Sequence, residues 1–169
     1  RCSVYSAMTI LAFLSSTLYH SLTPPSAKAV FRIFDHSSIF LFIAGTYTPF
    51  TLVTLRGPVG WTIFGVVWGA AIIGIVLNSI SIDRFKIFSM IAYVATGWAI
   101  IFAIFPLAGA LPVGGIILLV LGGLAYTLGI IFYAMKKVHY MHSIWHLFVL
   151  SGSILHYFSI LFYVVPGAK

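Results

Sequence analysis

The chain has 169 residues, of which 62% are hydrophobic and only 7% are charged, and its formal net charge is +7. A soluble domain carries roughly 25% charged residues, so this composition excludes an ordinary soluble protein and indicates one that crosses a membrane several times. The basic residues stand singly or in pairs between apolar runs, which is typical of loops facing anionic lipid headgroups and argues against a nucleic-acid partner.

About 20 apolar residues span a bilayer as a helix, and prolines and charges divide the chain into six such runs. Pro24 and Pro25 end the first run, because two prolines cannot continue a helix. Pro106 and Pro112 predict an apolar hairpin between the fourth and fifth runs. The predicted helices are about 3–21, 27–54, 59–80, 86–105, 112–135 and 139–164. We expect an all-α transmembrane bundle that forms a single domain over 1–169.

Glycine spacing predicts how two of these helices pack. Gly65 and Gly69 on the third helix form a small-xxx-small pattern, which lets helices approach closely. Gly115, Gly122 and Gly129 recur every seven residues on the fifth helix and therefore make one smooth stripe along it. We interpret this stripe as a packing face.

Successive loops lie on alternate sides of the membrane, so the basic residues can be compared between the two sides. One side, after the first, third and fifth helices, holds Lys28, Arg32, Arg84, Lys86, Lys136 and Lys137. The other side holds Arg1, Arg56 and Lys169. This excess predicts that the first set is cytoplasmic and that the carboxyl terminus lies outside. The short loops suggest a bacterial protein, and hence a bacterial inner membrane.

Three of the predicted helices carry an ionisable side chain near the cytoplasmic end. His20 ends the first helix, Asp35 lies about two turns into the second, and His142 and His146 lie in the first two turns of the sixth. With a rise of 1.5 Å per residue, all four lie within about 10 Å of the inner surface. Ionisable side chains inside a membrane are costly and indicate function, so we expect these residues to form one site.

The histidines suggest a metal. His142 and His146 are four residues apart, so they project from the same helix face and their imidazoles can share one ion. With His20 they would supply three nitrogen ligands, and three protein ligands plus water are usual in catalytic zinc sites. Imidazole nitrogens are common ligands of zinc, whereas magnesium and calcium prefer oxygen ligands. The alternative is that each histidine hydrogen-bonds a neighbouring helix.

Two oxygen-bearing residues are candidates for catalytic roles. Asp35 is the only carboxylate within a predicted span, and it could hold a zinc-bound water or take its proton. Its alternative is an ion pair with Arg32, three residues earlier on the same helix face. Ser16 lies four residues before His20 and could hold the water or stabilise an oxyanion. Its alternative is a hydrogen bond back to its own helix.

Of the other three histidines, two are interpreted as lying outside the central site, and the role of His139 is left open. His36 is rotated by about 100° from Asp35 around the helix, so we expect it at the membrane interface. His139 could be a fourth ligand or contact a headgroup. His156 lies about 15 Å deeper than His146 and is expected to make an interhelical hydrogen bond.

Three motifs in order carry a resemblance to a known family. They are Ser16-Thr17-Leu18-Tyr19-His20, the segment from Phe34-Asp35-His36 to Thr48-Pro49, and His142-Ser143-Ile144-Trp145-His146 with His156 behind it. In this combination the chain resembles the hemolysin III family of the progestin and adipoQ receptor superfamily. Alkaline ceramidases are more distantly similar.

The resemblance implies a seven-helix membrane protein with zinc near the cytoplasmic surface. It implies that His20, His142 and His146 are the zinc ligands, that Asp35 lies near the bound water, and that Ser16 matches the family's serine. The family has a helix before the one carrying S-x-x-x-H, and this chain does not. We expect that helix to precede Arg1 in a longer protein.

Our hypothesis is a zinc-dependent hydrolase of a lipid amide or ester, whose substrate enters from the bilayer. The alternative is a receptor-like or membrane-homeostasis protein with structural or regulatory zinc, which predicts four protein ligands or no open path to the metal. A cytolysin is a third hypothesis with little physical support, because the sequence shows no amphipathic pore-lining face. A proton or ion carrier has less support still, because beyond this one layer only His156 could relay charge.

Overall fold

The computed structural model describes residues 2–135 and 138–168. In these residues the regular elements are all helical, and six helical segments are long and apolar enough to cross a membrane. The all-α, six-span prediction is therefore confirmed. The helices group into two compact units, Arg1–Ala103 and Ile104–Lys169. The single domain expected over 1–169 stays a prediction.

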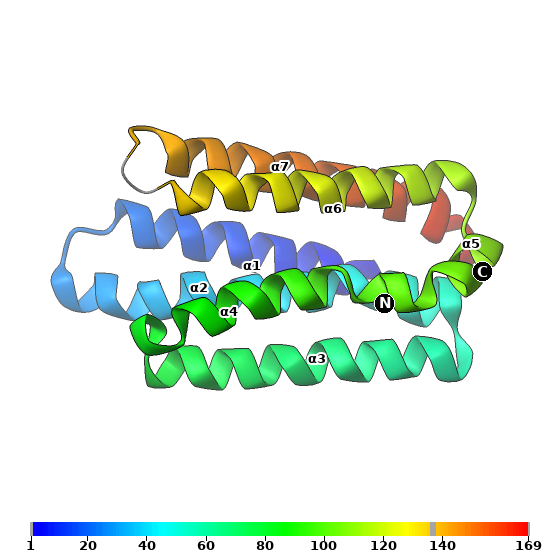
Figure 1. Cartoon of the computed structure of the whole chain (residues 1–169), viewed down its shortest axis with the longest axis horizontal. Helices are drawn as coiled ribbons and strands as arrows, with labels where there is room; N and C mark the ends of the chain where they lie inside the picture. Colours follow the sequence, from blue (N-terminus) through cyan, green and yellow to red (C-terminus); the bar gives the residue numbers. More distant parts are fainter. Residues whose placement is uncertain (1, 136–137, 169) are drawn as a thin grey trace. The chain divides into compact units, whose positions relative to one another are not determined.

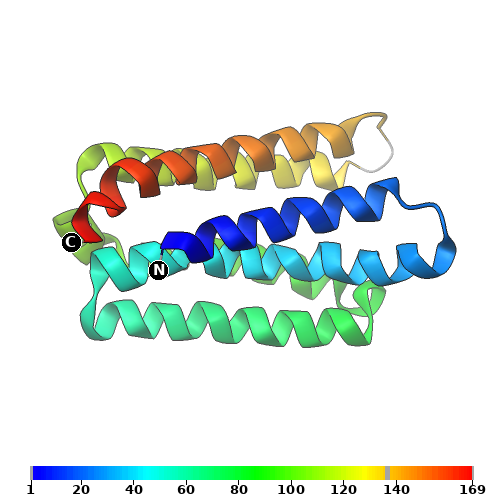
Figure 2. The same cartoon turned by 180° about the vertical axis from the view of Figure 1, so that it is seen from behind.

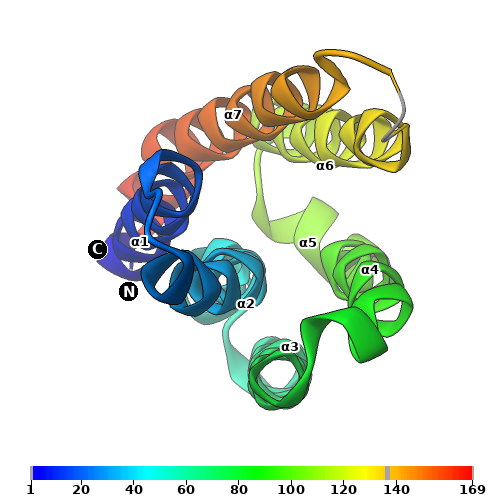
Figure 3. The same cartoon turned by 90° about the vertical axis from the view of Figure 1, so that its left-hand side faces the viewer.

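The first unit is built around its second helix. Its elements are α1 (Cys2–Ser21), α2 (Pro25–Pro49), the π-helix η1 (Phe50–Leu55), α3 (Gly57–Ile80), α4 (Ile82–Gly97) and the 3₁₀-helix η2 (Ala99–Ala103). Helix α2 contacts α1, α3 and α4, and Figure 3 shows it between α1 and α3. Because of this central place, 67% of the most apolar 18-residue stretch within Pro25–Leu55 is buried. The corresponding stretch within Cys2–Ser21 is only 11% buried.

Proline residues set both ends of α2. Pro24 is extended, and Pro25 takes the first helical position, where its missing N–H needs no partner. Pro49 cannot donate to the carbonyl one turn earlier, and the chain continues as the π-helix η1. Arg56, with a left-handed φ of 48°, ends this helix and leads through Gly57 into α3.

Helix α4 begins earlier than the sequence predicts. Ser81 is extended and its hydroxyl accepts a hydrogen bond from the Arg84 N–H at 3.3 Å, so it caps a helix that starts at Ile82. The predicted start at 86 is wrong because Asp83 and its charged neighbours form the first turn rather than a loop. A carboxylate in that turn also suits the helix dipole.

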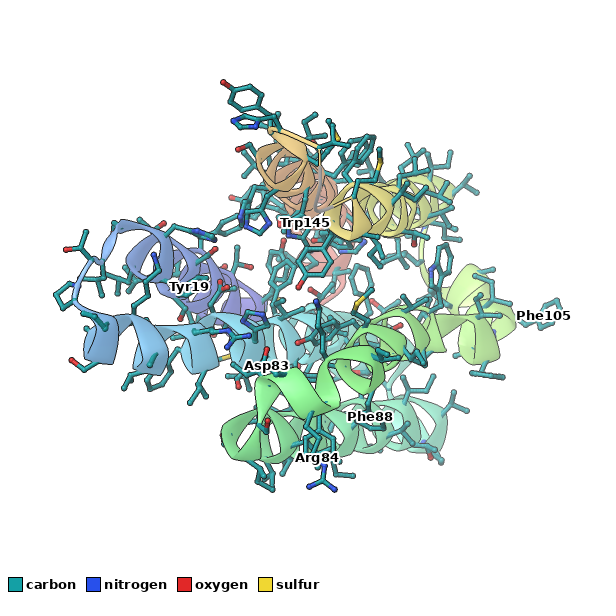
Figure 4. The ribbon with its side chains drawn as sticks, turned by 60° about the vertical axis from the view of Figure 1, so that its left-hand side comes forward. Tyr19, Asp83, Arg84, Phe88, Phe105 and Trp145 are labelled. Carbon is teal, nitrogen blue, oxygen red and sulfur yellow. The ribbon has the colours of Figure 1, made fainter. Side chains whose placement is uncertain are left out.

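The predicted hairpin after the fourth helix is also wider than the observed one. The helical run continues through η2 and α5 (Ile104–Ala110), and the turn is confined to Leu111 and Pro112. Pro106 is tolerated because it is the third residue of α5, where helix N–H groups have no intrahelical partner. Phe105 on α5 is 89% exposed and points outward in Figure 4, as expected for a side chain facing lipid.

The first unit packs through glycines that the sequence pattern did not single out. The core joins Phe40, Ala44 and Tyr47 of α2 to Ile63, Val67 and Ala71 of α3. A methyl group added at Gly74 would meet the Phe40 ring, and one added at Gly45 would lie 2.7 Å from the Met8 side chain. Around Gly65 and Gly69 there is open space among the described residues. Their predicted role in close helix packing is therefore wrong.

The second unit is a helical hairpin. It contains α5, α6 (Val113–Ala134), α7 (Met141–Ser159), the π-helix η3 (Ile160–Val164) and the 3₁₀-helix η4 (Pro166–Ala168). Helices α6 and α7 run side by side in opposite directions (Figures 1 and 2). Tyr140, with a left-handed φ of 64°, precedes α7, so this helix starts at Met141 rather than at 139. Lys136 and Lys137, predicted to end the fifth helix, lie outside the described residues.

The glycine stripe on α6 is confirmed as a packing face. Gly115, Gly122 and Gly129 are its buried residues. A methyl group added at Gly122 would meet the His156 ring, and one at Gly129 would lie 2.9 Å from the Phe148 Cβ. The missing side chains therefore let α6 and α7 approach closely.

Candidate metal and catalytic site

Helix α7 brings His142 and His146 together in its first two turns. Their Nε2 atoms are 3.1 Å apart, and the two rings are perpendicular with centroids separated by 4.6 Å. The Tyr133 ring of α6 lies against His142 and Trp145, with centroid distances of 6.2 and 5.3 Å. Spacing on one helix sets the pair, and packing against α6 supports it.

The distance between these nitrogens fits a shared metal ion. Two imidazole nitrogens bound tetrahedrally to zinc at about 2.0–2.1 Å are separated by about 3.3–3.4 Å. The observed 3.1 Å needs only a small change to reach that value. Without an ion, the same arrangement is a hydrogen bond in which one Nε2 carries a proton and the other accepts it.

In the first unit, the Tyr19 ring connects His20 of α1 to His36 of α2. Ring centroids are 4.8 Å apart between Tyr19 and His20, and 6.4 Å apart between Tyr19 and His36. The Lys28 ammonium lies 5.7 Å from the Tyr19 centroid, which adds a cation–π contact. Tyr19, labelled in Figure 4, therefore places His20 close to the first turns of α2.

Asp35 lies beside His36 at this same end of the unit. The Asp35 Oδ2 atom is 3.7 Å from His36 Nδ1, and their side chains are 17% and 22% exposed. His36 Nδ1 is also 2.9 Å from the Arg32 carbonyl oxygen. Since a carbonyl can only accept, Nδ1 carries the proton in this contact, and Nε2 of the neutral ring is an acceptor.

The 100° rotation between His36 and Asp35 does not separate their side chains as expected from the sequence, because His36 Nδ1 lies 3.7 Å from Asp35 Oδ2. The position of His36 at the membrane interface stays a prediction. Its helical position is rotated from that of Asp35, but the ring folds back toward Arg32, one turn earlier. Tyr93 of α4 donates to the His36 carbonyl oxygen at 2.7 Å and ties this turn to the unit's interior. In the sequence, this contact could have been inferred from the four-residue spacing of Arg32 and His36, which places the two residues one helical turn apart.

Arg32 makes a two-bond ion pair with Asp83 of α4. Arg32 Nη1 lies 3.1 Å from Asp83 Oδ2, and Nη2 bonds Oδ1. The alternative role considered for Asp35 was an ion pair with Arg32. The Arg32 guanidinium is instead bonded to Asp83, and this bond would compete with an ion pair to Asp35. Asp35 itself is half-buried, and its catalytic role stays a prediction.

Ser16 is half-buried on α1, one turn before His20. Its neighbour Thr17 hydrogen-bonds to its own helix, because the Thr17 hydroxyl donates to the Phe13 carbonyl oxygen at 2.8 Å.

The other two histidines lie on or next to α7. His156 Nε2 lies 3.0 Å from the Leu119 carbonyl oxygen of α6, so its predicted interhelical hydrogen bond is confirmed. The His139 ring lies against Tyr140.

Each unit thus assembles part of the predicted site. The second unit brings His142 and His146 together. In the first unit, His20 and His36 lie against the Tyr19 ring, and Asp35 lies beside His36. A centre that takes ligands from both units stays a prediction.

Comparison with known proteins places the chain in a family. A family model described as "Haemolysin-III related" matches residues 1–157. The chain is 48% identical to "Hemolysin-3" of Bacillus cereus, and the match covers 99% of this chain and 76% of that protein. It is 44% identical to "Hemolysin-3 homolog" of Bacillus subtilis (strain 168), over 96% of this chain and 76% of that protein.

A human relative is more distant. The chain is 25% identical to "Monocyte to macrophage differentiation factor" of Homo sapiens, over 93% of this chain and 67% of that protein. No solved structure matches the chain. With a family match over most of its length and bacterial relatives above 40% identity, this membrane protein belongs to the haemolysin-III-related family.

Proposed function

We propose that this protein hydrolyses an amide or ester bond of a membrane lipid at a zinc site formed by His20, His142 and His146. The observation that carries the proposal is the 3.1 Å separation of the His142 and His146 Nε2 atoms, which suits two ligands of one ion. His20 supplies the third nitrogen from the end of α1. Family membership supports this ligand set, because these histidines lie in the motifs on which the resemblance rests.

The roles of the surrounding residues follow from their chemistry. A zinc ion supplies Lewis acidity, which polarises a carbonyl and makes water more acidic. The half-buried Asp35 accepts a proton from the attacking water and returns it to the leaving amine or alcohol. The Ser16 hydroxyl donates a hydrogen bond to the oxygen on which negative charge develops.

A lipid substrate follows from the setting of these residues. The helices that carry them are long and apolar enough to cross a bilayer, so a lipid has direct access from the membrane. We propose that the site faces the cytoplasm of a bacterial cell, because the basic loops are concentrated at that end. The carboxyl terminus would then lie outside.

The first test measures zinc content. The full-length protein is purified and assayed beside His146→Ala and Asp35→Asn, with Asp83→Asn as the matched control for the carboxylate. His139→Ala tests whether this histidine is a fourth ligand, and loss of zinc in this variant would favour the four-ligand alternative. We expect about one zinc per chain in the wild type, in Asp35→Asn, in Asp83→Asn and in His139→Ala. We expect zinc to be lost in His146→Ala. A wild-type protein without zinc would reject the metal site.

The second test measures lipid hydrolysis by mass spectrometry, with a panel of N-acylated sphingoid bases and glycerolipid esters in vesicles. We expect fatty acid release by the wild type and by Asp83→Asn, and none by His146→Ala or Asp35→Asn. Zinc binding without turnover of any lipid in the panel would instead favour the receptor-like or homeostatic role. Release of haemoglobin from erythrocytes without lipid turnover would favour lysis, the activity after which the two Bacillus relatives are named.

A further inference from the structure

A cleft of about 200 Å³, lined by both polar and apolar residues, lies within the first unit, where α3 passes into α4 opposite the start of α2. Its lining includes Arg32, Asn78, Ser79, Ile80, Ser81 and Asp83. A water molecule takes about 30 Å³ in the liquid, so the cleft has room for a larger group. None of these residues belongs to the proposed zinc site.

Asn78 gives the first indication of what this group is. It is the one asparagine of the chain, it lies in the last turn of an apolar helix, and it is 1% exposed. Ser89 of α4 donates to its Oδ1 at 2.9 Å. Its Nδ2 has no acceptor among the described residues. A buried amide donor is costly to leave unpaired, so this end of the cleft calls for an acceptor from elsewhere.

The hydroxyl groups of the lining offer both donors and acceptors. Ser81 Oγ accepts from the Arg84 N–H, and its own proton remains available for donation. Ser79 Oγ donates to the Ile75 carbonyl at 2.8 Å, and its lone pairs remain available to accept. The cleft is therefore not specialised for a ligand of a single polarity.

The charges of the lining also have both signs. The Arg32 guanidinium and the Asp83 carboxylate form an ion pair, so together they add no net charge. The Asp83 side chain is 75% exposed, which leaves its oxygens accessible to a further donor. An anion alone would meet a neutral lining, whereas a zwitterion would find a partner for each charge.

We propose that this cleft binds the headgroup of a zwitterionic phospholipid that carries a primary ammonium group. Its phosphate would accept hydrogen bonds from the Asn78 amide and the Ser81 hydroxyl near the positive charge of Arg32. Its ammonium would donate to the Asp83 carboxylate. A quaternary ammonium has no N–H to donate, so a choline headgroup would bind less well. This site stands independently of the proposed hydrolysis.

The surroundings of the cleft suit a lipid rather than a soluble ester. Ile80 lines the cleft, and Ile80, Val76 and Ile73 are 67%, 53% and 57% exposed. Their spacing places them on one face of α3, so acyl chains could lie along them from the cleft toward the membrane interior. Asp83, labelled in Figure 4, lies in the first turn of α4, at the predicted depth of the headgroups.

Lipid binding to the full-length protein in detergent can be measured by native mass spectrometry. The probes are dioleoyl phosphatidylethanolamine, phosphatidylglycerol and phosphatidylcholine. We expect the wild type to prefer the ethanolamine lipid by about tenfold. Asp83→Asn leaves the lining with a net positive charge, so its preference should change to phosphatidylglycerol. Arg32→Gln should weaken binding of both. The matched control Arg84→Gln, on a residue outside the cleft whose guanidinium lies over Phe85, should behave as the wild type does.

Several outcomes would overturn the proposal. Equal binding of the three lipids, or an unchanged preference in Asp83→Asn, would mean that the cleft holds ordered water only. Displacement of the lipid by an equal concentration of glycerophosphoethanolamine would assign the site to the soluble ester. Asp83→Asn changes an exposed side chain, and a thermal melt of each variant identifies any that fails to fold. Asn78→Ser then tests the buried amide donor separately. An unchanged affinity for the ethanolamine lipid would show that the lipid phosphate does not bind at the Asn78 end of the cleft.

Discussion

At the residue scale, the candidate site depends on how rings are held as much as on which residues are present. His142 and His146 are fixed by their spacing on one helix, and the sequence was sufficient to predict that they meet. His20 is held differently, because the Tyr19 ring packs against it and also against His36. Tyr19 therefore acts as a positioning residue for the proposed third ligand.

Replacing Tyr19 tests this positioning. Tyr19→Leu removes the ring and should weaken zinc binding by about 10- to 100-fold, the usual effect of losing a group that orients a ligand. Tyr19→Phe keeps the ring and should bind zinc as the wild type does. Zinc affinity is measured by competition with a chromophoric chelator in the full-length protein. Equal affinities of the wild type and Tyr19→Leu would show that His20 needs no support from this ring.

His36 shows where prediction at this scale failed. Helical position alone placed it away from Asp35, but rotation of its side chain returns the ring to the Arg32 carbonyl. Sequence spacing fixes the direction of a Cβ atom and not the rotamer that follows it. If the ring orients Asp35, His36→Leu should lower kcat for lipid hydrolysis and leave zinc content unchanged. Loss of zinc in this variant would instead indicate that His36 supports the ligands.

At the scale of the helix, the sequence predicted which segments cross the membrane but only partly how they pack. Apolar runs and paired prolines were sufficient to identify six spans, because hydrogen bonding within the bilayer forces each run into a helix. The start of α4 was missed because a serine cap converts charged residues into a first turn. Gly65 and Gly69 were misread because spacing identifies a smooth face but not the helix that covers it.

Alanine substitutions distinguish the two kinds of glycine. Gly122→Ala would push a methyl group into the His156 ring and toward the Gly152 carbonyl oxygen, 3.2 Å away. Overpacking of this kind costs about 1–3 kcal/mol, so the melting temperature in detergent should fall by several degrees. Gly65→Ala meets open space and adds helix propensity, so the melting temperature should be unchanged or slightly higher. Equal destabilisation by both substitutions would mean that a partner covers Gly65 in the membrane.

At the scale of the whole molecule, the distribution of charge decides how the protein sits in the bilayer. The chain has nine basic and two acidic residues, so the orientation is predicted almost entirely from the basic loops. The proposed hydrolytic site and the proposed lipid headgroup site are both formed by residues near the helix ends that the positive-inside rule assigns to the cytoplasm. Orientation is therefore a premise that both proposals share.

Cysteine labelling in intact cells measures this orientation. Cys2, the one cysteine of this chain, and any cysteine elsewhere in the full-length protein are replaced by serine, and a single new cysteine is introduced at Arg84 or at Gly167. Six basic residues against three predict that a membrane-impermeant maleimide labels Gly167→Cys in intact cells but labels Arg84→Cys only after lysis. Both positions are exposed, so access to the reagent depends on the side of the membrane. The reverse pattern would put the histidines and the phospholipid cleft on the outer face, and the lipid substrate would then come from the outer leaflet.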